Sequence, residues 1–325
     1  MTGATADASA RWAVVAVAAG LRPAADPVLA PSHSNDTWLL EDERWGAAVL
    51  RVCWRGDVAR LPREAAVGAA LPAAVGYPAV LGAGTTADGA LSWTLTRRLP
   101  GCSLRTAWPG LGPGGRRDAV DAVVDALAAL HAFRPPPSLR PVLRLAPLPA
   151  APSVDAVVGR SMSPWPDGVG VLLAAASDRA PADLVAAVRR LLERDAALGP
   201  ALDAASPTLV HGDLHLDNVW TDGQRVTGLL DLEWVRPAPP WVELARVADE
   251  VDQDVADGVA GHAQLLAGLR RRLPGLEAVD RLPARLRLWR VAYQLRELVL
   301  WPVTAPAEAP PDHPVRLLAV LVGAG

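Results

Sequence analysis

The strongest constraint on this sequence is a dense polar stretch, residues 209–220, that lies between two apolar runs. Within eight residues it holds two histidines, two carboxylates and an amide, namely His211, Asp213, His215, Asp217 and Asn218. Gly212 allows a tight turn just before Asp213. Such a turn would project the Asp213 carboxylate into a cleft from the end of a strand, and Asn218 could return to the same cleft five residues later.

A second apolar run, residues 226–232, carries Asp231 thirteen residues after Asn218. We interpret this run as a neighbouring buried strand, where a carboxylate is costly unless it is paired or binds a metal. Carboxylate and amide oxygens are ligands that suit Mg2+. The spacing therefore predicts a Mg-nucleotide site with Asn218 and Asp231 on the metal. Asp213, which is off the metal, would accept the proton of a substrate hydroxyl.

The histidines are interpreted mainly as structural. His211 is predicted to hold the loop by hydrogen bonds, whereas His215 is left open between a phosphate contact and a contact with the loop backbone. The remaining four are predicted to be structural: His33, His131, His262 and His313.

Composition limits the class of protein. The chain has 325 residues, 51% of them apolar, which allows a sizeable core in one two-lobed fold or two small domains. The formal net charge of -3 gives no sign of a nucleic-acid partner. Only two cysteines are present, without metal-ligand spacing, so a reduced, cytoplasmic compartment is predicted. All 32 basic residues are arginine, so a site that would often use lysine must use arginine here.

An apolar run near the N-terminus, residues 12–21, is ten residues long and too short to span a bilayer. A signal-peptide core is the alternative, but no basic cluster precedes the run and Asp7 lies upstream. We therefore predict a short amphipathic helix over residues 9–19, packed on the body of the protein, and no membrane partner.

Hydrophobic periodicity and turn signals divide the rest of the chain into two lobes joined by a hinge at residues 98–101. A helix and extended lead-in, residues 1–25, precede a small mixed lobe at residues 26–97. The elements predicted in this lobe are strands at 28–30, 37–40, 47–54, 80–84 and 91–96 and a helix at 61–71. The second lobe, residues 102–325, is mainly helical. Its helices are predicted at 116–133, 181–195, 200–205, 241–251, 256–273, 282–300 and 314–322, with an irregular proline-rich segment at 135–152.

The form His211-Gly212-Asp213-Leu214-His215, with Asn218 and then Asp231, resembles the catalytic loop and metal aspartate of the aminoglycoside phosphotransferase and choline kinase-like family. The resemblance covers roughly residues 26–250. It implies an α+β protein-kinase-like fold, with an antiparallel sheet in the small lobe. It also implies Mg-nucleotide-dependent phosphorylation of a small-molecule alcohol. Asp231 is followed by Leu-Glu-Trp instead of Phe-Gly, and no Ala-Pro-Glu segment follows, which argues against a protein kinase.

The resemblance also implies roles in the small lobe. Arg51, on the third predicted strand, falls where the family places a lysine that grips phosphate, and Glu64 on the next helix would orient it. Arginine can grip phosphate through its planar fork, although the two residue types are not equivalent. Ser34 and Asn35 lie in the turn between strands that would cover the nucleotide phosphates, without a Gly-x-Gly-x-x-Gly motif.

Several alternatives stay open. The nucleotide can be ATP or GTP, the alcohol can be aminoglycoside-like, an amino alcohol, a macrolide or a sugar, and the chain is predicted to be a monomer or weak homodimer. An acidic run at residues 249–257 suits either an amino-bearing substrate or a solvated helix face. The competing functions are a catalytically silent nucleotide-binding regulator and a metallophosphoesterase, for which further His/Asp metal motifs are lacking.

Overall fold

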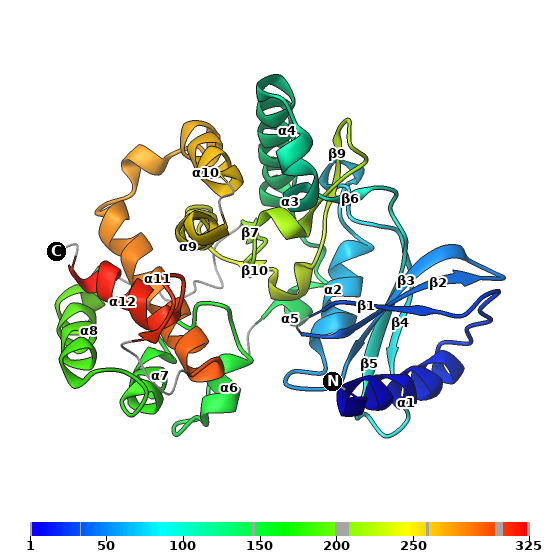
Figure 1. Cartoon of the computed structure of the whole chain (residues 1–325), viewed down its shortest axis with the longest axis horizontal. Coiled ribbons are helices and arrows are strands. Elements are labelled where there is room, and N and C mark those ends of the chain that lie inside the picture. Colours follow the sequence, from blue (N-terminus) through cyan, green and yellow to red (C-terminus); the bar gives the residue numbers. More distant parts are fainter. Residues whose placement is uncertain are drawn as a thin grey trace.

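A five-stranded antiparallel sheet, in the order β1-β2-β3-β5-β4, forms the centre of the N-terminal lobe. The coordinates come from a computed structural model, and the residues that it describes are 2–32, 34–144, 147–198, 208–257, 260–302 and 308–323, with the side chains of 2–6 and 255–257 left out. The elements of this lobe are α1 (Thr2–Ala18), β1 (Val28–Ala30), β2 (Asp36–Asp42), β3 (Gly46–Cys53), α2 (Arg60–Gly68), β4 (Val80–Thr85) and β5 (Ser92–Arg97). Figure 1 shows this lobe beside the helical one.

Side chains along β3 alternate between the two faces of the sheet, with apolar residues on one face and Arg51 on the other. Ala48, Leu50 and Val52 are fully buried in the cluster that includes Val15 of α1. Because successive side chains of a strand point to opposite faces, Arg51 lies on the other face, which packs against α2. Full burial of a side chain such as Leu50 stabilises the lobe by roughly 1.5–3 kcal/mol. The core on one face therefore fixes the direction of Arg51 on the other.

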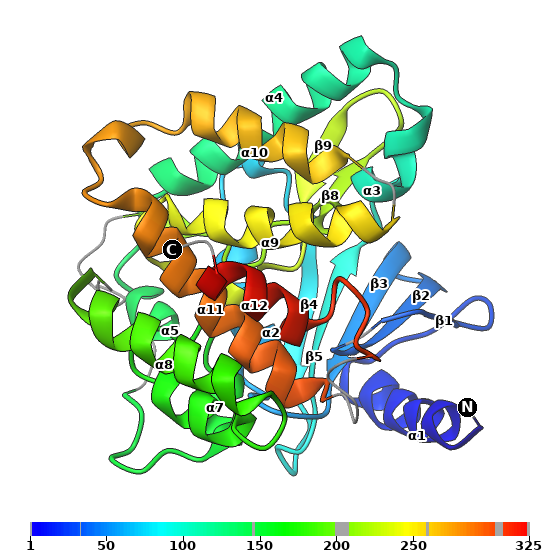
Figure 2. The same ribbon diagram turned by 60° about the vertical axis from the view of Figure 1, so that its left-hand side comes forward.

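The C-terminal lobe surrounds a second core and is mainly helical. Its helices are α3 (Leu104–Ala107), α4 (Pro113–Ala132), α5 (Arg140–Leu143), α6 (Val154–Val158), α7 (Val169–Ala176), α8 (Ala182–Asp195), α9 (Val242–Asp257), α10 (Gly261–Arg272), α11 (Leu282–Leu300) and α12 (Pro314–Gly323). Its short strands are β6 (Cys102–Ser103), β7 (Leu209–Val210), β8 (Val219–Thr221), β9 (Val226–Leu229) and β10 (Arg236–Pro237). The turned view in Figure 2 shows α9 between α10 and α11, and α9 contacts both helices.

A glycine is required at the end of the hinge. Gly101 has φ of 100°, and a Cβ at this position would lie 1.9 Å from the carbonyl oxygen of Thr221. Immediately after it, Cys102 pairs with Thr221 as β6 joins β8. The hinge is therefore held directly against the strand that follows the polar stretch.

The sequence predicted most elements, with errors at their ends. The first helix begins at Thr2 instead of residue 9, and α9 extends to Asp257, where we expected it to end at residue 251. The proline-rich segment contains the short helix α5, and the helix predicted at 200–205 lies outside the described residues. Among the helices that the structure describes, none has the length and hydrophobicity to span a membrane.

Candidate active site

The polar stretch begins with the predicted turn. β7 ends at Val210, which pairs with Arg236 of β10, and Gly212 follows with φ of 83°. A Cβ on Gly212 would lie 2.5 Å from the carbonyl oxygen of Trp234. Only glycine therefore lets the chain turn this close to the 234–236 segment and present Asp213, and the close approach fixes the two segments together.

His211 holds this turn through both ring nitrogens. Nε2 lies 2.9 Å from the carbonyl oxygen of Leu230, and Nδ1 accepts the N–H of Asp213 at 3.3 Å. Burial lowers the pKa of His211, although Glu243 opposes the shift. The neutral ring therefore donates from Nε2. Glu243, at the start of α9, accepts the backbone N–H of His211 and so ties the loop to this helix.

Asn218 closes the loop back onto Asp213. Its Nδ2 donates to the carbonyl oxygen of Asp213 at 2.9 Å. The carbonyl oxygen of Asn218 accepts the N–H of Leu230 at 2.8 Å. The Asn218 side chain is thereby fixed through its nitrogen, and Leu230 is the residue directly before Asp231.

The position of Asp231 corrects one prediction. We expected it on a buried strand, but β9 ends at Leu229 and Asp231 has φ of 59°, in the left-handed region. Such a conformation costs a non-glycine residue about 1–2 kcal/mol. Its side chain is 28% exposed and lies 2.8 Å from Nη2 of Arg51. The turn brings the carboxylate out of the strand and across to the other lobe.

Arg51 joins three carboxylates. Its Nη1 lies 2.6 Å from Glu64, and its Nη2 lies 3.2 Å from Glu233 as well as close to Asp231. Burial lowers the pKa of Arg51, but these three carboxylates raise it by more, so the net pKa is well above its ordinary value. Glu64 also accepts the hydroxyl of Tyr77 at 2.9 Å. The structure thus forms the Arg51–Glu64 pair that the sequence indicated.

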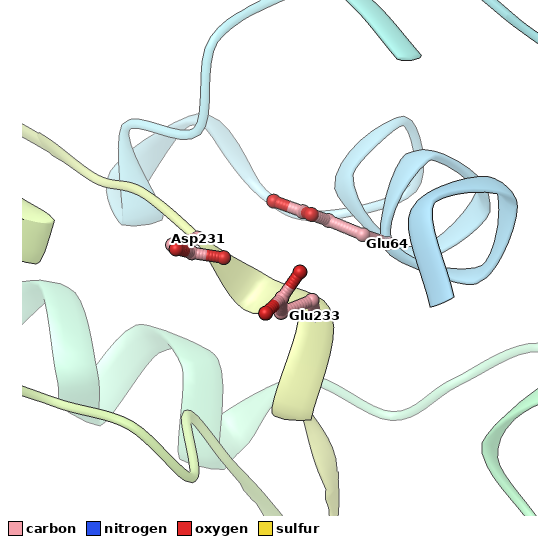
Figure 3. A group of neighbouring side chains, drawn as sticks. All are labelled: Glu64, Asp231 and Glu233. Atoms are coloured by element: carbon pink, nitrogen blue, oxygen red, sulfur yellow. The ribbon is translucent and has the colours of Figure 1, made fainter. Parts of the chain in front are cut away.

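The carboxylates of Glu64, Asp231 and Glu233 face a shared space (Figure 3). They offer oxygens that lie within 4.8 Å of one another. Burial, followed by the charge of Asp231, raises the pKa of Glu233 to about 7. Such an arrangement favours a cation between the three groups, and Arg51 already supplies one charge.

The turn between β1 and β2 also reaches this cluster. Nδ2 of Asn35 donates to Glu233 at 3.0 Å and to Oγ of Ser34 at 3.2 Å. Oδ1 of Asn35 accepts from Arg60 at 3.2 Å. Ser34 and Asn35 are therefore beside the carboxylates, with the Asn35 side chain already engaged by Glu233 and Arg60.

Arg246 of α9 fixes the carboxylate of Asp213. Nε of Arg246 lies 2.7 Å from Oδ1 of Asp213, and Nη1 donates to Glu250. His215 lies 3.9 Å from Oδ2. Burial raises the pKa of Asp213, but Arg246 and His215 lower it by more, so the net pKa is below its ordinary value. Asp213 is therefore ionised, with Oδ2 as the oxygen that Arg246 leaves available.

The acidic run on α9 is not a solvated helix face. Its buried members are paired inside the lobe. Asp249 binds Arg290 at 2.9 Å. Asp254 lies 3.2 Å from Arg105 and 2.9 Å from Nδ1 of His262. The side chain of Asp257 lies outside the described residues.

His262 has a contact that the sequence did not suggest. Its Nε2 accepts the backbone N–H of Leu216 at 2.9 Å, inside the polar stretch. Because that acceptor must be unprotonated, Nδ1 carries the proton and faces Asp254. Helix α10 is thereby tied to the loop between Asp213 and Asn218.

Sequence reasoning also missed Arg246, although a signal was present. Glu243, Arg246, Glu250 and Asp254 follow one another at helical spacing, so they share one face of α9. We interpreted the later carboxylates of this stripe as an acidic run. Arg60 and the role of Glu233 had no comparable signal, because Glu233 lies far from Arg60 and Asn35 in the sequence. Tyr77 is closer to its partner Glu64, but no local pattern indicated that contact.

The antiparallel small lobe, the helical second lobe and the site between them define a protein with a protein-kinase-like fold. A family model described as "Phosphotransferase enzyme family" matches residues 28–298, and the chain therefore belongs to this family. This membership confirms the predicted family and the predicted enzyme class, a small-molecule kinase. No protein of curated function matches the chain.

Solved structures share the fold at low sequence identity. The crystal structure of aminoglycoside phosphotransferase APH(4)-Ia is 19% identical with a TM-score of 0.64, and the match covers 98% of this chain and 99% of that chain. A thermostable mutant of that enzyme, in ternary complex with AMP-PNP and hygromycin B, is 20% identical over 93% of this chain and 95% of that chain, with a TM-score of 0.58. The GDP complex of aminoglycoside 2'-phosphotransferase-IIIa is 15% identical, covers 96% of both chains and has a TM-score of 0.60. These likenesses confirm the predicted two-lobed α+β fold.

Proposed function

We propose that this chain transfers the terminal phosphate of ATP or GTP to the hydroxyl of a small molecule. One observation carries the proposal: a continuous set of contacts links Asp213, Asn218, Asp231, Arg51 and Glu64 across the two lobes. In the reaction, the acceptor oxygen forms the new P–O bond and the bond to the bridging oxygen breaks. The nucleoside diphosphate leaves, and the hydroxyl proton passes to Asp213.

Asp213 acts first by orienting the acceptor. Its lowered pKa makes it a weak base, so the Oδ2 atom accepts a hydrogen bond from the hydroxyl and takes the proton only as the P–O bond forms. Arg246 holds Oδ1 and thereby sets the direction of Oδ2. Positioning of this kind supplies much of the rate enhancement in phosphoryl transfer.

The residues at the lobe junction fit Mg2+. The donors are all oxygens, as this hard cation prefers, and the Asp231 carboxylate is accessible. Asn218 would contribute Oδ1, because Nδ2 is bound to the Asp213 carbonyl. Mg2+ neutralises charge on the phosphates when it is bound. Arg51 would grip a phosphate in exchange for part of its contact with Asp231, while Glu64 keeps the guanidinium in place.

The fold neighbours support a nucleotide co-substrate. They include complexes with AMP-PNP and with GDP, so the likeness does not favour one base over the other. The domain division at residues 26–97, 98–101 and 102–325 belongs to the same proposal, with the nucleotide between the lobes and the acceptor on the helical side.

The test is Asp213→Asn, which keeps the size of the side chain and removes its charge. We expect phosphate transfer to a panel of alcohols to fall by roughly 10²- to 10⁴-fold, with Mg-nucleotide affinity nearly unchanged in calorimetry. Asp217→Asn is the matched control, because this carboxylate lies in the same loop and is 48% exposed. Normal transfer by Asp213→Asn would contradict the assignment. Nucleotide binding by the wild type without transfer to any alcohol would favour the silent regulator.

A further inference from the structure

A cavity of about 580 Å³ lies between the two lobes. On the N-terminal side its wall includes Gly56, Asp57 and Arg63 of α2. On the C-terminal side the wall is formed by residues 142–144, 147–149, 155–156, 159–160 and 233–236, which include parts of α5 and α6. These two helices can be located in Figure 1. The volume is in the range of pockets that hold small-molecule ligands.

The cavity borders the proposed transfer centre. Glu233 lines it and also contacts Arg51, 3.2 Å away. Nη1 of Arg236, another lining residue, lies 3.1 Å from the place where a Cβ on Gly212 would be. Gly212 directly precedes Asp213. A small molecule in this cavity would therefore lie beside Arg236, whose guanidinium packs against the turn that presents Asp213.

The charge of the lining is biased toward cations. Four arginines line the cavity, against three carboxylates. The arginines are Arg63, Arg144, Arg160 and Arg236, and the carboxylates are Asp57, Asp155 and Glu233. Asp57 is taken up by Arg63 at 2.9 Å, and Glu233 is taken up by Arg51 and Arg60.

Arg236 is the unusual member of this lining. It is 2% exposed, and its Nε has no hydrogen-bond partner among the described residues. Nη1 donates to the carbonyl oxygen of Trp234 at 3.3 Å, and the guanidinium lies 5.6 Å from the ring of Trp289. No carboxylate in the described part of the chain forms an ion pair with it.

Burial lowers the pKa of Arg236 to about 10, and the more distant charges of Glu243 and Asp213 only partly oppose the shift. Because a guanidinium stays protonated at working pH, the lowered pKa expresses an uncompensated cost of burying the cation. Buried charges in proteins are normally paired. A planar guanidinium with unsatisfied donors matches a carboxylate or a phosphate.

We propose that this cavity binds the anionic group of the acceptor, so that the substrate is an alcohol bearing a carboxylate or a phosphate, and that Arg236 selects it. The inference rests on the proposed phosphotransferase function and deepens it. The acidic run on α9 offers less for an amino-bearing substrate, because its buried carboxylates are already paired with arginines or His262.

Matched acceptors test the proposal. One arm compares 3-hydroxypropanoate with its amide, and the other compares glucose 6-phosphate with glucose. The wild type should prefer the anionic partner in at least one arm by roughly 10- to 100-fold in kcat/KM, the range expected for a hydrogen-bonded charge. The two arms distinguish a carboxylate from a phosphate. Arg236→Met should remove the preference, mainly by raising KM, and Arg236→Lys should keep part of it.

Two measurements keep the outcomes separate. Arg272→Met removes an arginine that pairs with Asp125 on the surface, and it should leave the preference unchanged. Calorimetric binding of the same anions and of inorganic phosphate, without nucleotide, is compared in the wild type and in Arg236→Met. Arg236-dependent binding without any transfer would support the anion site and count against the phosphotransferase. Transfer to neutral or amino-bearing alcohols with no anion preference would overturn the anion site alone. If none of these anions binds in an Arg236-dependent way, the anion site is also overturned.

Discussion

Two arginines of the candidate site, Arg51 beside Asp231 and Arg236 beside Gly212, have opposite surroundings. Arg51 lies among Glu64, Asp231 and Glu233, and its pKa is raised well above the ordinary value. Arg236 is more deeply buried, at 2% exposed against 15% for the Arg51 side chain, yet it lacks an ion pair among the described residues, and its pKa is lowered. The fold thus provides carboxylates that balance the charge of Arg51, but it provides no carboxylate in an ion pair with Arg236 among the described residues.

The difference indicates what each arginine contributes before a ligand arrives. Arg51 joins the lobes, since its partners come from α2 and from the turn after β9. Removing one partner of a buried charge cluster is strongly destabilising, because the others are left uncompensated. Arg236 does not link the lobes by ion pairs, so we expect little loss of stability when its charge is removed. Its charge becomes favourable only when an anion occupies the cavity.

The largest effect is expected for Arg51→Met. It leaves three carboxylates without their common cation, so the free energy of unfolding in urea should fall by about 3–5 kcal/mol. Arg272→Met, at an exposed pair with Asp125, should lower the free energy of unfolding far less, because exposed ion pairs contribute little. Adding Glu233→Gln to Arg51→Met should recover part of the loss, because one uncompensated charge is removed. If Arg51→Met and Arg272→Met had the same free energy of unfolding, the proposed structural role of Arg51 would be contradicted.

Arg236→Met, in contrast to Arg51→Met, should not lower the free energy of unfolding. The lowering of its pKa to about 10 corresponds to a cost on the order of 3 kcal/mol for the buried charge. Loss of the packing against Trp289 offsets part of the gain. We expect the unfolding free energy to stay equal or to rise by roughly 1–2 kcal/mol, measured without added anions. A loss as large as that of Arg51→Met would show that Arg236 has a structural partner.

The two arginines were not equally predictable from the sequence. Arg51 and Glu64 were predicted from the family resemblance, which places a phosphate-gripping side chain on the third strand and the carboxylate that orients it on the next helix. The turn at Gly212 was predictable from the residues themselves, because a glycine directly before Asp213 is a local feature. Arg236 gave no signal, since its burial depends on Trp289 and on the close approach of Gly212.

Long-range contacts account for the other omissions. Asn35 and Glu233 are 198 residues apart, and no local pattern joins them. The conformation of Asp231 was missed because the apolar run suggested a longer strand, whereas the left-handed turn is set by contacts across the lobes. The stripe of Glu243, Arg246 and Glu250 was visible in the sequence, but the position of its face against Asp213 was not.

The smallest effect, and the one that most sharpens the comparison, is expected for Ala156→Glu. Ala156 lines the cavity from α6, and a carboxylate there would take the place of a ligand's anion. The unfolding free energy should rise by about 0.5–1 kcal/mol, while the affinity for 3-hydroxypropanoate and glucose 6-phosphate falls. Ala156→Gln is the control of equal size. In the Arg236→Met background the gain should vanish, because the two groups would then no longer interact. A gain that persists there would mean that the new carboxylate is paired with a different arginine of the lining, and that Arg236 is not the group an anion meets.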